Sequence, residues 1–134
     1  MTRGRSTTLF CCACNEDVQA RLTTGAEIYP HRPDLAAIPF WRCDACENYV
    51  GCHHKTKDKT RPLGVIPSPV MRIVRQEVHG ILDPIWRSGR VTRRTVYAQM
   101  SKILNREFHT AELRILADAY EAVRAAKKVA EKFI

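Results

Sequence analysis

Two pairs of cysteines with the same internal spacing constrain the fold of this chain more than any other feature. Cys11 and Cys14 form one C-x2-C pair, and Cys43 and Cys46 form the other. Two thiolates separated by two residues can bind one metal ion from a tight turn, and four thiolates complete the closed tetrahedral set that structural Zn²⁺ prefers. The spacing therefore predicts one structural zinc, bound by all four cysteines in a zinc-ribbon-like β module with a long loop between the pairs.

The length of the chain makes such a metal important for stability. With 134 residues, the chain can form one ordinary domain or two small ones, and small domains bury a limited share of their apolar surface. The apolar stretch Leu9-Phe10 is too short for a signal peptide, and no apolar run approaches the ~20 residues that span a bilayer. We therefore expect a cytoplasmic protein without a membrane partner. Three disulfide bonds are the alternative use of the six cysteines, but a reducing compartment favours metal binding.

The positive charge of the chain is unevenly distributed. The formal net charge is +8; residues 1–66 hold nine Lys or Arg against seven Asp or Glu (+2), and residues 67–134 hold thirteen against seven (+6). Such a surface attracts polyanions without selecting among them. We expect a nucleic acid, DNA or RNA, as the partner, with an acidic host protein as the second possibility. Scattered solvated charges with no partner are the simpler alternative.

Residues 1–66 are predicted to form the zinc-ribbon-like module with a basic connector. Short segments of strand-forming residues alternate with turn formers, and Thr23-Thr24-Gly25 is the expected turn of a hairpin. Residues 53–67 form a polar, basic connector that ends in proline and glycine, so a domain boundary is expected there or just after it. The expected strands are Thr7–Phe10, Val18–Leu22, Ala26–Tyr29 and Ile38–Arg42.

Residues 67–134 are predicted to form a three-helix bundle, which makes the chain an α+β protein. Apolar residues recur at three- and four-residue steps, which is the period of an amphipathic helix. The first helix should end near residues 87–89, and Pro84 should kink or shorten it. The second helix should end near Asn105. The expected starts are Ser68 before the first helix, Thr92 before the second and Thr110 at the third.

The turn between the first two helices carries a cluster of arginines. It is short and contains glycine, which is compatible with a helix-turn-helix arrangement but also with any three-helix bundle. Arg93 and Arg94 lie in the first turn of the second helix, where the positive end of the helix dipole disfavours cations. A helix N-terminus is also a place where phosphate oxygens bind well. We interpret the cluster as a phosphate-binding surface; the alternative is that all four side chains point into water. The predicted nucleic-acid contacts are Arg87, Arg90, Arg93 and Arg94, assisted by Lys55, Lys57, Lys59 and Arg61 of the connector.

The histidines permit a second metal site without predicting one. His31 lies between the cysteine pairs, and His53 and His54 follow Cys52, so an open site near them would make a metal-dependent nuclease. Nothing in the spacing brings these residues together, and the four cysteines already complete a coordination shell. Asp34 is expected to pair with a neighbouring arginine and stiffen its loop. We therefore expect a protein that is not an enzyme.

Several strings of the sequence resemble a bacterial and phage family of zinc-finger-containing domains of unknown function. The resemblance covers most of residues 8–105 and implies that Cys11, rather than Cys12, joins Cys14, Cys43 and Cys46 as a zinc ligand. It implies no known activity. The chain departs from the family's pattern in its longer, more basic connector and in the C-terminal helix, which leaves room for a small phage-encoded effector of a host nucleoprotein complex. The strings are Ile28–Leu35, Phe40–Cys46, Tyr49–His53, Pro62–Gly64, Val78–His79 and Asp83–Trp86.

The sequence thus predicts a zinc-stabilised, non-enzymatic protein of bacterial or phage origin that binds nucleic acid. In this interpretation zinc holds the scaffold and the arginines make the contact. The alternative is a protein-interaction module, such as a small inhibitor or adaptor, that docks on an acidic host protein through the zinc ribbon or the third helix. A metal-dependent nuclease is the third possibility.

Overall fold

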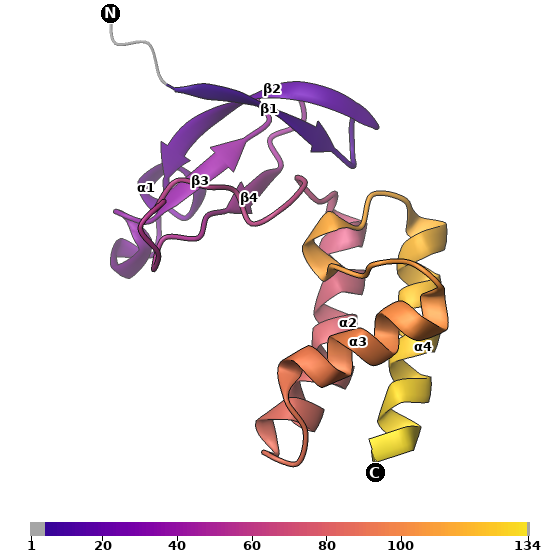
Figure 1. The fold of residues 1–134 in the computed structure, drawn as a ribbon. Coiled ribbons are helices and arrows are strands. Elements are labelled where there is room, and N and C mark those ends of the chain that lie inside the picture. Colours follow the sequence, from indigo (N-terminus) through magenta and orange to yellow (C-terminus); the bar gives the residue numbers. More distant parts are fainter. Residues whose placement is uncertain (1–4, 134) are drawn as a thin grey trace, which may run out of the picture. The chain divides into compact units, whose positions relative to one another are not determined.

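The protein forms two compact units, and the division between them falls after Pro69. The structure is a computed structural model that describes residues 5–133. The first unit contains an antiparallel sheet of four strands, and the second contains three α-helices (Figure 1). The predicted α+β class, with a β module followed by a helical bundle, is confirmed. No helix within residues 5–133 has the length and apolar character needed to cross a membrane.

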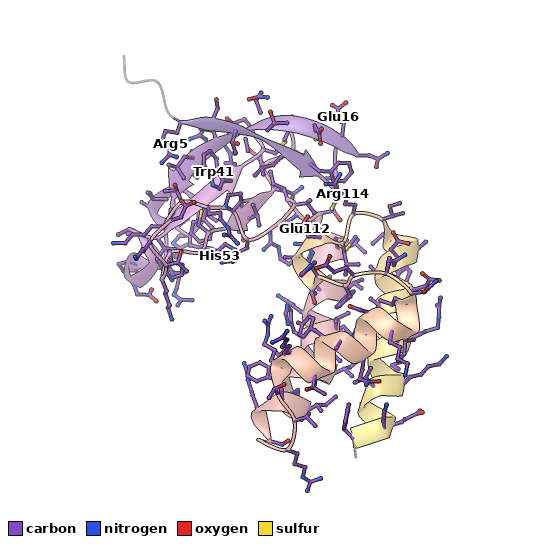
Figure 2. All side chains as sticks on the ribbon, viewed as in Figure 1. Arg5, Glu16, Trp41, His53, Glu112 and Arg114 are labelled. Carbon is purple, nitrogen blue, oxygen red and sulfur yellow. The ribbon has the colours of Figure 1, made fainter. Side chains whose placement is uncertain are left out.

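The sheet of the first unit follows the chain in a simple meander. Its strands are β1 (Ser6–Cys11), β2 (Glu16–Thr24), β3 (Pro39–Arg42) and β4 (Tyr49–Gly51), and they lie side by side in that order. In the register, Trp41 of β3 stands between Leu22 of β2 and Val50 of β4. Trp41 is buried, and Figure 2 shows its side chain on the sheet. The core of this unit therefore lies against the middle of the sheet.

The hairpin predicted at Thr23-Thr24-Gly25 is wrong. Strand β2 runs through Thr24, and the chain then forms one helical turn, α1 (Gly25–Ile28), instead of a returning strand. Gly25 packs directly against the next turn, because an added Cβ would lie 1.8 Å from the carbonyl oxygen of Leu35. The two hairpin turns of the sheet are formed by the cysteine pairs instead.

The long loop between β2 and β3 is held by side chains. It contains α1 and the 3-10 turn η1 (Pro33–Leu35). Arg32 donates two hydrogen bonds to Asp34, from Nε at 2.9 Å and from Nη2 at 2.7 Å. The ring of Tyr29 contacts those of Phe40 and Tyr49 edge to face, with centroids 5.8 and 5.5 Å apart. The predicted pairing of Asp34 with a neighbouring arginine is therefore observed, and the stiffening of the loop stays a prediction.

The connector of residues 53–67 packs on the sheet. Trp41 Nε1 donates a hydrogen bond to the carbonyl oxygen of Thr60 at 2.6 Å. Ile66 is fully buried, and its backbone N–H donates to the carbonyl oxygen of Phe10, while its own carbonyl accepts from the N–H of Cys12, each at 2.9 Å. The basic segment is therefore a folded part of the first unit.

The second unit contains α2 (Pro69–Arg87), α3 (Arg93–Leu104) and α4 (Leu116–Phe133). Helix α2 continues past Pro84 to Arg87 and does not end early. Thr92 caps α3, because its Oγ1 accepts the N–H of Thr95 at 3.1 Å, and Asn105 ends the helix in a left-handed conformation. Each helix buries apolar side chains, among them Val74, Val78, Leu82, Val96, Met100, Val123, Ala126 and Val129.

The third helix starts later than predicted. Thr110 begins only a 3-10 turn, η2 (Thr110–Glu112), and α4 begins at Leu116. The backbone at Leu113 is extended, with ψ at 122°, which interrupts any continuous helix. The carbonyl oxygen of Leu113 accepts a hydrogen bond from Arg75 Nη2 of α2 at 3.1 Å. A hydrogen bond from α2 thus holds the extended backbone at Leu113, which the N-cap character of Thr110 did not indicate.

Candidate zinc centre

The two cysteine pairs occupy matching turns of the sheet. One pair lies between β1 and β2 and the other between β3 and β4, so the meander brings both turns to the same end of the sheet. In each turn the residue after the second cysteine is left-handed, Asn15 with φ 57° and Glu47 with φ 68°. Its N–H donates to the carbonyl of the first cysteine, Cys11 or Cys43, at 2.7 Å in both turns. Because the two turns have the same backbone conformation and lie at the same end of the sheet, the four cysteine side chains converge on one site.

The four sulfurs form a cluster of the size that one zinc ion needs. Cys11 Sγ lies 3.4 Å from Cys46 Sγ, Cys14 Sγ lies 3.7 Å from Cys43 Sγ, and all four sulfurs lie within 4.8 Å of one another. Zn–S bonds of about 2.3 Å in a tetrahedron place neighbouring sulfurs about 3.8 Å apart. A disulfide would instead require about 2.05 Å. The cluster therefore fits a single structural Zn²⁺, as the sequence predicts.

The surroundings of the cluster are those of a closed site. Cys11 and Cys43 are buried, and they pack with Trp41, Val50 and Ile66 in the core of the first unit. A zinc bound by four sulfurs has no position left for water or substrate, which is typical of structural sites. A zinc ion held here would join two turns of the sheet.

Two of the four thiols are expected to keep their protons at neutral pH when no metal is bound. Burial raises the pKa of Cys11 to about 11, and the hydrogen bond with Cys43 together with burial raises the pKa of Cys14 to about 12. Burial also acts on Cys46, but hydrogen bonds from the backbone and side chain of Asn48 lower its pKa to about 7. The side-chain contact, Asn48 Nδ2 to Cys46 Sγ, is 3.2 Å long. Zinc binding must therefore displace protons from the site.

An ion-pair network supports the second cysteine turn. Arg21 of β2 donates to both carboxylate oxygens of Asp44, which lies between Cys43 and Cys46, with each contact at 2.9 Å. The same guanidinium contacts Glu27 at 3.0 Å. The hydrogen bond from Arg21 holds the pKa of Asp44 below its ordinary value. Arginine pairs a carboxylate well in this two-pronged geometry, so the network ties the turn to β2 and α1.

Among the residues that the structure describes, the other cysteines and histidines form no second group placed to hold a metal. Cys52 is buried in the core, and burial raises its pKa to about 11. His54 Nδ1 lies 3.3 Å from the carbonyl oxygen of Cys52, and His31 is exposed in the loop before β3. Figure 2 shows His53 on the segment that follows β4. Within residues 5–133, the Cys, His, Asp and Glu side chains that lie close enough together to bind one metal ion are those of the four-cysteine cluster.

The predicted phosphate-binding residues are exposed in two places. One set lies around the turn between α2 and α3 in the second unit, and the other lies in the connector of the first unit. The guanidinium of Arg87 lies 5.3 Å from the ring centre of Trp86, and that of Arg93 lies 4.6 Å from the ring centre of Tyr97. The exposed residues are Arg87, Arg90, Arg93, Arg94, Lys55, Lys57, Lys59 and Arg61.

The sequence interpretation missed the residues that support the zinc ligands. Arg21 and Asn48 contact the second cysteine turn, yet neither belongs to a spacing pattern. Asp44 was the one sequence signal for such a support. Its carboxylate lies between two ligand cysteines, so the repulsion from nearby thiolates favours a cationic partner for it. The sequence does not show which arginine supplies that charge.

Comparison with known protein families assigns the chain to a family. The sequence model of a family described as a zinc-finger-containing domain matches residues 7–131. No curated protein and no solved structure shows a significant match. The family match includes the four clustered cysteines and extends through most of α4. The C-terminal helix, which the resemblance in the sequence left out, is therefore part of the matched domain.

Proposed function

The chain belongs to a family of zinc-finger-containing domains, and from that premise we propose that it is a non-enzymatic protein that binds nucleic acid. In this proposal the zinc organises the first unit. The contact with phosphates is made by the arginines around the α2–α3 turn, assisted by the cations of the connector. A structural zinc with four sulfur ligands supports a binding role, because it offers no open position for catalysis.

The observation that carries the proposal is a long stretch without acidic residues. From residue 84 to residue 106 the sequence contains no Asp or Glu, and the acids that border it are Asp83 and Glu107. Both acids are engaged within the unit: Asp83 lies 3.9 Å from Arg87, and Glu107 lies 2.9 Å from His109. The six cations of the stretch are Arg87, Arg90, Arg93, Arg94, Lys102 and Arg106. Arg87 and Arg106 lie within 4 Å of carboxylates outside the stretch. The other four cations have no acidic residue within the stretch to neutralise them, which favours phosphate binding.

Aromatic rings hold two of these arginines in defined positions. Arg93 lies over the ring of Tyr97, one helical turn further along α3, and Arg87 lies over the ring of Trp86. A guanidinium stacked on a ring keeps its N–H edge available for two hydrogen bonds to a phosphate. Because these side chains are already ordered, less conformational entropy is lost on binding.

The connector offers a smaller set of cations in the first unit. Residues 53–61 contain three lysines and one arginine against a single acid, Asp58. Elsewhere in this unit Arg21, Arg32 and Arg42 are each paired with a carboxylate. The connector therefore supplies much of the positive charge that remains available to a phosphate backbone.

The proposal is tested by measuring binding to duplex DNA and duplex RNA at several salt concentrations. Each phosphate contact on duplex DNA adds about 0.9 to the slope of log K against log salt. Arg90→Gln with Arg94→Gln should therefore reduce that slope by about 1.8. Lys127→Gln with Lys128→Gln removes the same charge from the exposed face of α4 and should leave the slope nearly unchanged.

Three results count against this proposal. Absence of binding to every oligonucleotide at low salt contradicts the nucleic-acid partner. Cleavage of the oligonucleotides on addition of Mg²⁺ or Mn²⁺ contradicts the non-enzymatic role, because it requires an open metal site. Equal effects of the two double variants indicate attraction by net charge alone and exclude a specific surface at the α2–α3 turn.

A further inference from the structure

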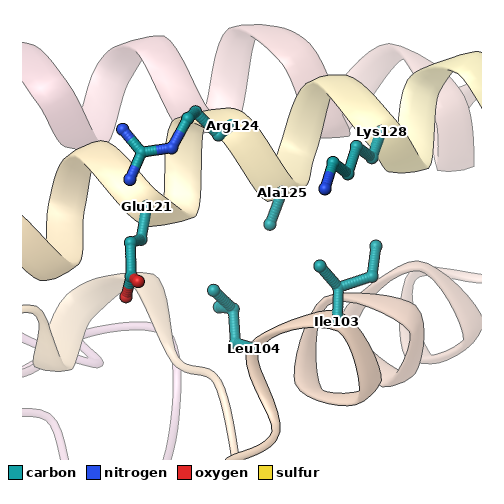
Figure 3. Close-up of a pocket in the computed structure, with 6 residues that line it drawn as sticks. All are labelled: Ile103, Leu104, Glu121, Arg124, Ala125 and Lys128. Carbon is teal, nitrogen blue, oxygen red and sulfur yellow. The ribbon is translucent and has the colours of Figure 1, made fainter.

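A groove lies between the C-terminal end of α3 and the middle of α4, far in sequence from the α2–α3 turn. Its volume is about 190 Å³. Figure 3 shows the side chains of α4 along one side and the end of α3 along the other. The lining residues are Ile103, Leu104, Glu121, Arg124, Ala125 and Lys128.

The groove combines an apolar floor with a positive rim. Ala125 is buried, and Ile103 is an apolar side chain that remains 41% exposed. Arg124 and Lys128 are exposed one helical turn apart on α4, and neither is in an ion pair within residues 5–133. The third charged lining residue is Glu121, and its carboxylate shares Arg106 with Asp118, at 3.8 and 3.7 Å. The groove therefore presents two cations outside any ion pair and one partly neutralised carboxylate, beside exposed hydrocarbon.

The size of the groove limits what it can hold. Sites for cofactors and metabolites usually measure about 300–1,000 Å³, so 190 Å³ suits one side chain better than a whole small molecule. A nucleic-acid phosphate would pair with the cations but would leave the apolar floor in water. An aliphatic side chain flanked by carboxylates satisfies both parts of the surface.

We propose that this α3–α4 groove binds an acidic peptide segment of a partner protein. One aliphatic side chain of the segment covers Leu104 and Ala125, while carboxylates on either side of it pair with Arg124 and Lys128. The site uses different residues from the phosphate-binding surface and goes beyond nucleic-acid binding, because it gives the protein a second, proteinaceous partner.

The test uses a fluorescein-labelled peptide, Asp-Glu-Asp-Leu-Glu-Asp, titrated into the zinc-loaded full chain. Fluorescence anisotropy gives the affinity, and methyl NMR signals of Ile103 and Leu104 report the place of binding. Arg124→Glu and Lys128→Glu should each weaken binding about tenfold, because attraction becomes repulsion. Lys127→Glu is the matched control; it makes the same charge change one residue away, outside the lining of the groove, and should weaken binding less than about twofold.

A second peptide, with Ser in place of Leu, tests the apolar floor without altering the protein. It should bind about fivefold more weakly and shift the methyl signals less. Equal binding of the two peptides overturns the proposal, as does an equal loss in Lys127→Glu and Lys128→Glu. Shifts of the Ile103 and Leu104 signals by a duplex oligonucleotide, with none by the peptide, also overturn it and assign the groove to the nucleic acid.

Discussion

At the scale of single residues, Gly25 is a position that a larger residue cannot fill without moving the backbone. A Cβ there would lie 1.8 Å from the oxygen and 2.6 Å from the carbon of the Leu35 carbonyl group. Backbone atoms cannot rotate away as a flexible side chain can. We therefore expect Gly25→Ala to lower the free energy of unfolding by about 3 kcal/mol or more, the upper range for overpacked sites. Denaturant titration of the zinc-loaded protein measures this loss.

Gly80 of α2 provides the matched control for that substitution. Beyond its chain neighbours and the backbone of its own helix, no heavy atom lies within 4 Å of a Cβ added there. Alanine is better than glycine inside a helix by about 1 kcal/mol. Gly80→Ala should therefore raise the free energy of unfolding of the second unit. A similar small gain in Gly25→Ala contradicts the close approach of Gly25 to Leu35.

Apart from the metal ligands, residue patterns predicted contacts only where the partners are close in sequence. The C-x2-C spacing identified the zinc cluster because each pair is a local turn with a fixed ligand geometry. The pairing of Arg32 with Asp34 was accessible for the same reason. The pairing of Arg21 with Asp44 depends on the register of β2 beside β3. No local rule specifies that register.

At the scale of elements, the start of α3 depends on one hydroxyl group. Thr92 Oγ1 accepts the N–H of Thr95 at 3.1 Å and lies beside Arg93 and Arg94 in the sequence. Thr92→Ala should lower the stability of the second unit by about 1 kcal/mol, the usual loss for a missing N-cap oxygen. Thermal unfolding followed by circular dichroism measures it. Thr92→Ser keeps the oxygen and should change little; an equal loss in both variants contradicts the capping role.

Elements were predicted well where local signals agree with packing. Thr92 and Asn105 bound α3 as expected, because N-caps and left-handed C-caps are short-range features. Thr110 has the same N-cap character, but the extended backbone at Leu113 and the hydrogen bond from Arg75 delay α4. The turn formers before Gly25 likewise indicated a hairpin, and packing against Leu35 produced a helical turn instead. Tertiary contacts decided both cases.

At the scale of the whole molecule, the zinc and the helical core stabilise different parts of the chain. The four ligands all belong to the first unit, and the buried helix residues from Met71 to Val129 belong to the second. Structural zinc contributes about 10–16 kcal/mol of binding free energy in small modules, which matches the whole stability of a typical domain, about 5–15 kcal/mol. Loss of the metal should therefore unfold the first unit while the helices of the second remain.

Chelation of the purified full chain tests this division. Removal of one zinc per chain should collapse the well-dispersed amide NMR signals of β1–β4 into the narrow range of an unfolded segment and leave most of the helical circular dichroism. Cys11→Ser should have the same effect as the chelator, whereas Cys12→Ser, at the neighbouring position outside the sulfur cluster, should keep one zinc. Loss of the helical signal together with the sheet would show that the second unit depends on the metal as well. In that case the arginines of the α2–α3 turn would bind phosphates only in the zinc-loaded protein, and the salt dependence of nucleic-acid binding would disappear on chelation.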